Sequence, residues 1–230
     1  MNPGEPLLVA RKLRLLMELR RAGIGDARVL GALEKTPREL FVPDSFQDQA
    51  YENVALPIGR GQTVSQPYVV ALMTEKLEIG ERHKMLEIGT GSGYQAAILA
   101  RLCRRVFSVE RHRDLWRDAQ RRFAELRLHN VVCRCGDGSR GWPEQTPFDR
   151  ILVTAAAPDV PTALIDGLIP GGILVAPVGA DHRDQQLLRI RRNETGFSTE
   201  ALGSVRFVPL IAGMPRDQRE DAEQSATPLD

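Results

Sequence analysis

A glycine-rich turn that follows a short apolar strand constrains the fold more than any other feature of the sequence. Residues Met85 to Tyr94 read Met-Leu-Glu-Ile-Gly-Thr-Gly-Ser-Gly-Tyr, and an apolar segment with helical spacing follows from Ala96 to Leu102. Glycines are needed where the backbone turns sharply and lies close to a ligand, because a Cβ would clash there. The pattern predicts a strand, a tight turn and a helix, with a ligand at the carboxyl end of the strand.

An acidic residue after the next predicted strand indicates the chemistry of that ligand. This strand covers Arg105 to Val109 and is followed by Glu110. A carboxylate at this place can accept hydrogen bonds from both hydroxyls of a ribose. The glycine spacing is G-x-G-x-G rather than the dinucleotide pattern G-x-G-x-x-G, which disfavours a nicotinamide oxidoreductase. Turn and acid together predict a nucleoside-bearing cofactor, with S-adenosylmethionine as the first candidate; a structural turn and a solvated glutamate are the alternative.

Composition indicates a single domain without a polyanionic partner. The chain has 230 residues, 42% of them hydrophobic, which is enough for one full core. Its 31 basic and 30 acidic residues give a formal charge of +1, so we expect no nucleic-acid partner. Since no apolar run is long enough for a membrane span and the first residues lack a signal-peptide pattern, we expect a cytoplasmic protein that binds no membrane. We also expect a monomer.

The cysteines and histidines predict no metal site. Cys133 and Cys135 are separated by one residue, and with Cys103 they make an odd number, which fits reduced thiols better than disulfides. The four histidines show no ligand spacing with one another or with the cysteines. No metal is expected.

Alternating helical and strand patterns predict an α/β fold. Helices are expected from Leu7 to Leu19, and from an N-cap at Asp26 to a stop before Pro37. After the glycine turn the expected order is a helix at Asp114–Leu126, strands at Val131–Cys133 and Phe148–Val153, a helix at Leu164–Leu168, a turn at Pro170–Gly172, and strands at Ile173–Ala176, Gln186–Arg191 and Leu202–Leu210.

This order predicts a doubly wound, mostly parallel, Rossmann-like sheet with N-terminal helices and a C-terminal antiparallel hairpin. We expect residues 1–215 to form one domain, in which residues 1–43 are the N-terminal helical region and residues 53–67 the active-site loop. Residues 216–230 are polar, and we expect them to be disordered.

The segment before the cofactor strand is the second informative stretch. Leu56 to Pro67 contains too much glycine, proline and hydroxyl character for a regular element, and a helix is predicted from Pro67 to Leu77. Ser65 or Gln66 would fall at the cap of that helix, where a hydroxyl can accept a backbone N–H. Alternatively, the loop can close over the reaction as a lid.

Two further strand ends carry candidate ligand groups. Asp137, flanked by glycines after the third predicted strand, can reach the exocyclic amine of an adenine or can be an ordinary turn aspartate. The small residues from Thr154 to Ala157 either leave room for a ligand or permit close packing.

The chain resembles the protein-L-isoaspartate O-methyltransferases, a family of class I S-adenosylmethionine-dependent methyltransferases. The resemblance covers Thr36 to Gly213, and it rests on the loop motif from Ala55 to Tyr68 and the cofactor motif from Leu86 to Tyr94. Further matches are Arg38–Pro43, Met73–Glu75, Phe148-Asp149, Pro170–Gly172 and Val205–Leu210.

That resemblance implies methyl transfer from S-adenosylmethionine to the free α-carboxylate of L-isoaspartyl residues in damaged proteins and peptides, after which the ester collapses to a succinimide. Ser65 would be the catalytic hydroxyl, and it can cap the helix as well. The cofactor would contact Thr63, Val64, Gln66, Glu87, Gly89, Thr90, Gly91, Ser92, Gly93, Glu110, Arg111, Asp137 and Gly138. The substrate would contact Leu56, Pro57, Ile58, Gly59, Val208 and Ile211, although Ile211 stands where some relatives have threonine.

Two other functions stay open. A related enzyme with the same fold and cofactor would methylate an ordinary aspartate of a biosynthetic peptide, or a small carboxylic acid. A regulatory protein would bind the nucleotide without turnover, which the intact Gly91, Glu110 and Ser65 disfavour.

Overall fold

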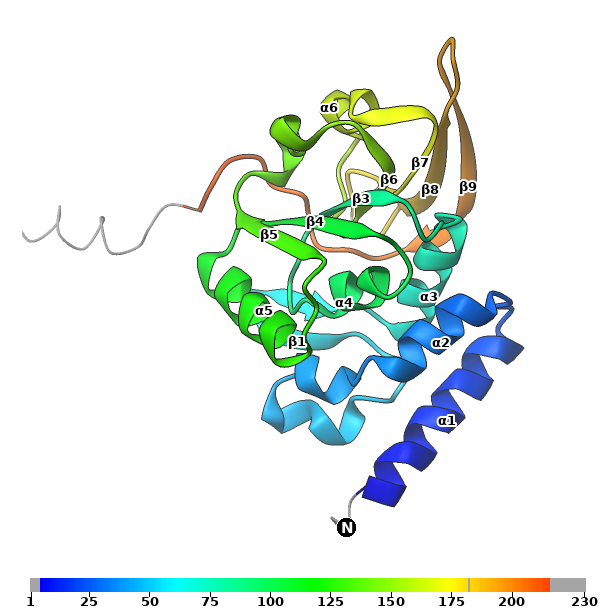
Figure 1. Cartoon of the computed structure of the whole chain (residues 1–230), viewed down its shortest axis with the longest axis vertical. Helices are drawn as coiled ribbons and strands as arrows, with labels where there is room; N and C mark the ends of the chain where they lie inside the picture. Colours follow the sequence, from blue (N-terminus) through cyan, green and yellow to red (C-terminus); the bar gives the residue numbers. More distant parts are fainter. Residues whose placement is uncertain (1–4, 182, 216–230) are drawn as a thin grey trace, which may run out of the picture.

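The structure is a computed structural model that describes residues 5–181 and 183–215 (Figure 1). One sheet is formed by β3 (Lys84–Ile88), β4 (Arg105–Glu110), β5 (Val131–Cys135), β6 (Phe148–Val153), β7 (Leu168–Val178), β8 (Gln185–Arg192) and β9 (Phe197–Val205). The strand order is β5-β4-β3-β6-β7-β8-β9; neighbouring strands from β5 to β7 are parallel, whereas β8 and β9 are antiparallel. The predicted fold class, with its mostly parallel sheet and C-terminal hairpin, is confirmed.

Helices cover both faces of this sheet. They are α1 (Glu5–Arg21), α2 (Ala27–Lys35), α3 (Pro67–Lys76), α4 (Tyr94–Ala100), α5 (Arg113–Glu125) and α6 (Thr162–Asp166), with 3-10 turns η1 (Arg38–Phe41), η2 (Asp44–Gln49), η3 (Gly138–Arg140) and η4 (Pro143–Gln145). In Figure 1, α6 lies across the sheet from the other five helices.

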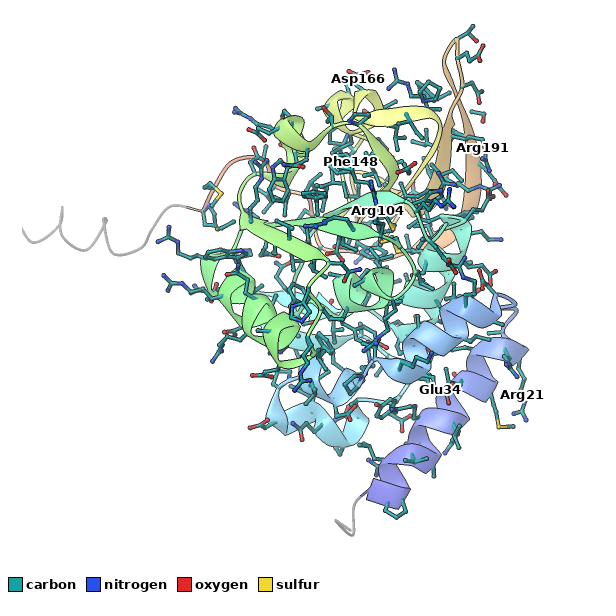
Figure 2. The ribbon with its side chains drawn as sticks, in the orientation of Figure 1. Arg21, Glu34, Arg104, Phe148, Asp166 and Arg191 are labelled. Carbon is teal, nitrogen blue, oxygen red and sulfur yellow. The ribbon has the colours of Figure 1, made fainter. Side chains whose placement is uncertain are left out.

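Alternate residues of the parallel strands bury on opposite faces, so that the sheet carries two hydrophobic clusters. Met85 and Val106 belong to the cluster that contains residues of α1 to α5, and Leu86 and Phe107 to the cluster that contains Leu164 of α6. Figure 2 labels Phe148, which belongs to the second cluster. Burial on both faces explains why these strands read as nearly continuous apolar runs.

Helix positions follow the sequence signals closely. Both predicted N-terminal helices are present, and Asp26 is the N-cap of α2, where its Oδ1 accepts the backbone N–H groups of Arg28 and Val29 at 2.7 and 3.3 Å. The helix after the glycine turn begins at Tyr94, and α3 begins at Pro67 as predicted. The arginines at the end of α1 are exposed; Figure 2 labels Arg21 there.

One segment that was expected to be irregular is a hairpin. β1 (Leu56–Gly59) and β2 (Gln62–Val64) pair in antiparallel fashion, with Leu56 opposite Val64. The turn between them places Gly59, Arg60 and Gly61 at φ values of 95°, 54° and 67°. Positive φ values at three successive residues favour glycine, which stands here at the first and third positions. These two glycines made the segment read as a loop in the sequence.

Two predictions near the C-terminus are wrong. Leu168, predicted to end a helix, begins β7. The predicted turn at Pro170–Gly172 lies within the bounds of β7 as an irregularity: Leu168 pairs with Phe148 and Ile173 with Arg150, and Gly171 has a φ of 79°. The last strand is Phe197–Val205 instead of Leu202–Leu210; it lies at the edge of the sheet, where exposed polar residues leave no apolar signal. Beyond it the chain crosses to the segment that follows β6, where the Leu210 N–H donates to the Ala156 carbonyl at 2.6 Å. The predicted disordered tail lies outside the described residues.

Candidate active site

The carboxyl ends of three neighbouring parallel strands meet at one rim. Here the Gly89 N–H donates to the Val109 carbonyl at 2.9 Å, which joins the end of β3 to β4. The Gly136 N–H donates to the Glu110 carbonyl at 2.9 Å, which joins β5 to β4. The structure thus brings together the glycine turn, Glu110 and the Gly-Asp-Gly segment that the sequence placed after three separate strands.

The glycine turn adopts a backbone that other residues would strain. Gly89, Gly91 and Gly93 have φ values of 95°, 53° and 92°. A Cβ on Gly89 would lie 2.3 Å from Thr154 Oγ1, and that hydroxyl donates to the carbonyl oxygens of Ile88 and Gly89 at 3.0 and 2.8 Å. The turn is therefore held against the end of β6 by Thr154, which the sequence had marked only as one of four small residues.

Glu110 ties the glycine turn to the end of β4. Its side chain is 4% exposed; Oε2 accepts the Gly91 N–H at 2.8 Å, and Oε1 accepts the His112 N–H at 2.9 Å. Each carboxylate oxygen has a second acceptor site, so that both can also accept a ligand hydroxyl. Two fixed backbone donors hold the carboxylate in one orientation.

A cavity of about 830 Å³, open to solvent, lies over this rim. Of the predicted site residues, it is lined by Thr63, Val64, Ser65, Gly89, Thr90, Gly91, Ser92, Glu110, Arg111, Gly138, Val208 and Ile211. Residues that sequence reasoning did not assign to a site also line it: Gln62, Val70, Ile88, Tyr94, Gln95, Val109, His112, Thr154, Ala155, Pro209 and Leu210.

The other predicted site residues lie nearby without lining this cavity. They are Leu56, Pro57, Ile58 and Gly59 in β1, Gln66 and Gly93 before α3 and α4, and Glu87 and Asp137. Asp137 accepts the Ser139 N–H and Oγ at 2.9 and 2.7 Å through Oδ1, and the Gly213 N–H at 2.8 Å through Oδ2. Although partial burial opposes it, these bonds from Ser139 and Gly213 lower the pKa of Asp137 from its ordinary value.

Glu87 lies beneath the glycine turn in a buried polar network. Its side chain is fully buried, its Oε2 is 2.5 Å from Ser108 Oγ, and Ser108 Oγ is 2.5 Å from Thr90 Oγ1. Burial raises the pKa of Glu87 to about 8; Ser108 acts in the opposite direction and Glu110 adds to the rise. Glu87 is therefore mostly protonated at neutral pH and supports Thr90 as a neutral hydrogen-bonding group.

This protonation predicts a pH dependence of stability. A carboxyl whose pKa is higher in the folded than in the unfolded state binds more protons when folded. The stability contributed by Glu87 therefore falls as the pH rises from 4.5, the ordinary pKa of a glutamate, to about 8, its pKa in the folded protein. Glu87→Gln removes this proton and should flatten the dependence of the unfolding free energy on pH over that range. Urea denaturation at several pH values measures it, with the exposed Glu144→Gln as control. Equal pH slopes in Glu87→Gln and the parent chain would contradict the prediction.

A second cavity adjoins the first at Ser65. This groove measures about 1650 Å³ when the space open to solvent is included, and it shares Thr63, Ser65, Thr154 and Val208 with the cavity over the rim. The N-cap residue of α3 is Gln66, which makes no side-chain capping hydrogen bond, so Ser65 is not the cap residue. Ser65 lines both cavities where they meet.

The described residues contain neither a candidate metal site nor a candidate membrane-spanning helix. Among them, no group of three or more His, Cys, Asp and Glu side chains could hold a metal ion. No helix in this part of the chain is long and apolar enough to cross a membrane.

Comparison with curated proteins gives relatives over nearly the whole chain. A protein-L-isoaspartate O-methyltransferase of Paramagnetospirillum magneticum is 60% identical over 218 residues, which are 94% of this chain and 100% of that protein. One of Rhodospirillum centenum is 57% identical over 215 residues, 91% of this chain and 97% of that protein.

Solved structures and a family model agree with these relatives. A protein-L-isoaspartate O-methyltransferase superposes with a TM-score of 0.79 and 28% identity over 93% of this chain and 69% of its own. A Plasmodium falciparum β-aspartate methyltransferase, solved in complex with S-adenosyl-L-homocysteine, gives 0.76 and 25% over 86% of this chain and 97% of its own. The family model matches residues 10–214. The chain belongs to the protein-L-isoaspartate(D-aspartate) O-methyltransferase family.

Proposed function

We propose that this chain transfers a methyl group from S-adenosylmethionine to the free α-carboxylate of L-isoaspartyl residues in damaged proteins and peptides. The observation that carries the proposal is the meeting of two cavities at Ser65, one over the glycine turn and one an open groove. The first suits a nucleoside-bearing donor, and the second leaves room for a peptide. Membership of the family supports this division of roles.

The residues over the rim fit S-adenosylmethionine. Gly89 and Gly138 line the cavity without a side chain, and neither can gain one freely, because a Cβ would lie 2.3 Å from Thr154 Oγ1 at Gly89 and 2.4 Å from Ile88 Cγ2 at Gly138. Glu110 would accept the ribose hydroxyls, while the backbone of the glycine turn would lie against the rest of the molecule. S-adenosylmethionine supplies a methyl group on a sulfonium, with a neutral thioether as the leaving group.

On the acceptor side the chain has to orient a nucleophile that is already charged. An α-carboxylate or β-carboxylate has an ordinary pKa of about 3.9 or below and is ionised at neutral pH, so no general base is needed. Holding reacting atoms in line can supply about 7–11 kcal/mol. Ser65 would donate a hydrogen bond to one carboxylate oxygen, and the β1–β2 hairpin would exclude water. An ion pair of 2.6 Å between Arg60 Nε and Asp114 Oδ2 joins the hairpin turn to α5.

The test is methyl transfer to two versions of one peptide. The purified chain is incubated with S-adenosylmethionine carrying a labelled methyl group and with either the isoaspartyl or the aspartyl peptide, and base-labile methyl ester is counted. We expect ester on the isoaspartyl peptide alone. Equal or preferential labelling of the aspartyl peptide would indicate the related enzyme class, and no transfer to either would overturn the proposal.

Ser65→Ala should slow methyl transfer to the isoaspartyl peptide by about tenfold, the effect of losing one hydrogen bond to a charged group. Cofactor affinity should stay within about threefold of the parent value, because backbone contacts in the cavity survive. Steady-state kinetics and calorimetric titration with S-adenosylhomocysteine measure the two effects. Unchanged turnover would show that Ser65 only shapes the cavity.

We further propose that the chain acts as a monomer in the cytoplasm, without nucleic acid. The formal charge of +1 and the odd number of cysteines support this. Light scattering during size-exclusion chromatography would give about the mass of one chain, 25.6 kDa; a mass twice as large would contradict the monomer.

A further inference from the structure

Arg38 is a buried arginine to which the reaction described above gives no role. It lies in η1 with 0% of its side chain exposed, and within residues 5–181 and 183–215 its Nε and Nη1 atoms have no hydrogen-bond partner. Among the described residues, no carboxylate lies within ion-pair distance of it. The neighbouring acid, Glu39, accepts the Tyr51 hydroxyl at 2.5 Å instead. Because burying an unpaired cation costs free energy, such a group calls for an explanation.

The contacts of Arg38 lead to both cavities. Its Nη2 donates to the carbonyl oxygens of Val54 and Ser65 at 3.3 and 2.9 Å, which joins the two ends of the β1–β2 hairpin. The guanidinium carbon lies 4.7 Å from the centre of the Tyr94 ring, and Tyr94 lines the cavity over the glycine turn. The guanidinium of Arg38 is thus in direct contact with residues that line the cavities: Tyr94 for the first, and Ser65 for both.

The charge of Arg38 persists in this environment. Burial lowers the pKa of the guanidinium, and Tyr94 and Tyr51 act in the opposite direction, but an arginine stays protonated in proteins. A charge surrounded by protein acts over a longer range than one in water. The amino end of α3, which begins two residues after Ser65, adds a partial positive charge of the same sign. A negatively charged group at Ser65 is therefore favoured over a neutral one.

We propose that Arg38 is a positioning residue for recognition of the acceptor carboxylate: it holds Ser65 at the junction of the two cavities and makes that junction electropositive. The inference rests on the proposed function. Attraction of the ionised ground state acts on binding of the acceptor and does not accelerate the chemical step, since stabilising the carboxylate makes it no better a nucleophile. Arg38 should thus lower the KM for the peptide without raising kcat.

The test compares an isoaspartyl peptide with its analogue in which the free α-carboxylate is an α-carboxamide. Binding of both peptides is measured by calorimetry in the presence of S-adenosylhomocysteine, for the parent chain and for Arg38→Gln. The parent should bind the carboxylate about tenfold more tightly than the carboxamide, a difference of about 1.4 kcal/mol. In Arg38→Gln this preference should fall to within about twofold, while the Kd of the carboxamide and that of S-adenosylhomocysteine stay within about threefold.

Arg150→Gln is the matched control. Arg150 is 8% exposed, and it also donates to backbone carbonyl oxygens, those of Leu77 and Glu78, but it lies outside both cavities. Its replacement should lower thermal stability and leave the preference for the carboxylate unchanged. If the role of Arg38 were purely structural, Arg38→Gln would likewise lower thermal stability and leave the preference for the carboxylate unchanged.

Two further variants keep the test decisive if Arg38→Gln does not fold. Arg38→Met fills the site with an apolar side chain, a change that buried charges often tolerate, and should lose the preference. Arg38→Lys retains the charge and should keep the preference within about threefold. The inference on Arg38 is overturned if a folded neutral variant still prefers the carboxylate, or if the lysine variant loses the preference. In either case the proposed function stands, provided that the parent methylates the isoaspartyl peptide. If the parent neither binds nor methylates the isoaspartyl peptide, the proposed function itself fails.

Discussion

Glu110→Gln is expected to weaken binding of S-adenosylmethionine by about 100-fold or more, because hydrogen bonds to a charged acceptor contribute about 1.5–3 kcal/mol each. The carboxylate has two acceptor oxygens, each already fixed by one backbone N–H, from Gly91 and from His112. A glutamine amide offers one acceptor oxygen and one donor. Whichever way the amide is turned, its NH2 group faces a backbone N–H that then lacks an acceptor, and a ribose hydroxyl loses its partner.

Calorimetric titration with S-adenosylhomocysteine measures this loss directly, and circular dichroism shows whether the variant is folded. Glu144→Gln makes the same chemical change at an exposed acid that pairs with Arg134 at 3.2 Å, and it should bind the ligand like the parent. An affinity of Glu110→Gln within about threefold of the parent value would mean that the carboxylate holds the turn and contacts no ribose.

The position of Glu110 shows what the sequence can predict well. Apolar runs of strand length, separated by helical periodicity, gave the parallel strands β3, β4, β5 and β6 within one or two residues. In β3, β4 and β6 the signal is strong because these strands are buried on both faces, whereas β5 at the edge is only partly buried. In a parallel sheet the residues after successive strands must share one rim. The expectation that Gly89, Glu110 and Asp137 lie at one rim followed from topology. The cavity over the rim is lined by Gly89 and Glu110, and by Gly138 in place of its neighbour Asp137.

The elements that were predicted wrongly depend on tertiary pairing. Leu56 and Val64 are 3% and 4% exposed and lie opposite each other in the β1–β2 hairpin, but the residues between them read as a loop. In β9, most side chains are exposed, and its place is set by backbone pairing with β8 and by an ion pair between Arg189 and Glu200 at 2.5 Å. Neither arrangement leaves a periodic apolar pattern.

Contacts between distant segments limited the prediction of the site in the same way. Thr154 follows β6 in sequence, and only the pairing of β3 with β6 brings its hydroxyl to the carbonyl of Gly89, 65 residues away. Arg38 was visible in the sequence only as part of a matching motif; its bonds to Val54 and Ser65 depend on the packing of η1 beneath the hairpin. A polar residue after a buried strand, such as Thr154, is the one signal that could have been used.

Gly89→Ala is expected to cost roughly 2–4 kcal/mol of folding free energy, from a left-handed backbone that is unfavourable for alanine and from overpacking. The φ of Gly89 is 95°, and the new Cβ would lie 2.3 Å from Thr154 Oγ1. Because that oxygen donates to the carbonyls of Ile88 and Gly89, it cannot withdraw without losing both bonds. The turn would have to shift, and with it the Gly91 N–H that Glu110 accepts.

Two comparisons separate the contact from the backbone strain. Gly171 has a φ of 79° and nothing within 4 Å of an added Cβ, so Gly171→Ala should show the strain alone and leave cofactor binding unchanged. Combining Gly89→Ala with Thr154→Ala removes the clashing oxygen and should recover part of the stability, a coupling that independent sites would not show. Urea denaturation of Gly89→Ala, Thr154→Ala, the double variant and Gly171→Ala measures it. If Gly89→Ala costs no more than Gly171→Ala, the contact with Thr154 is not what requires glycine at this position, and the cradle can accommodate a side chain.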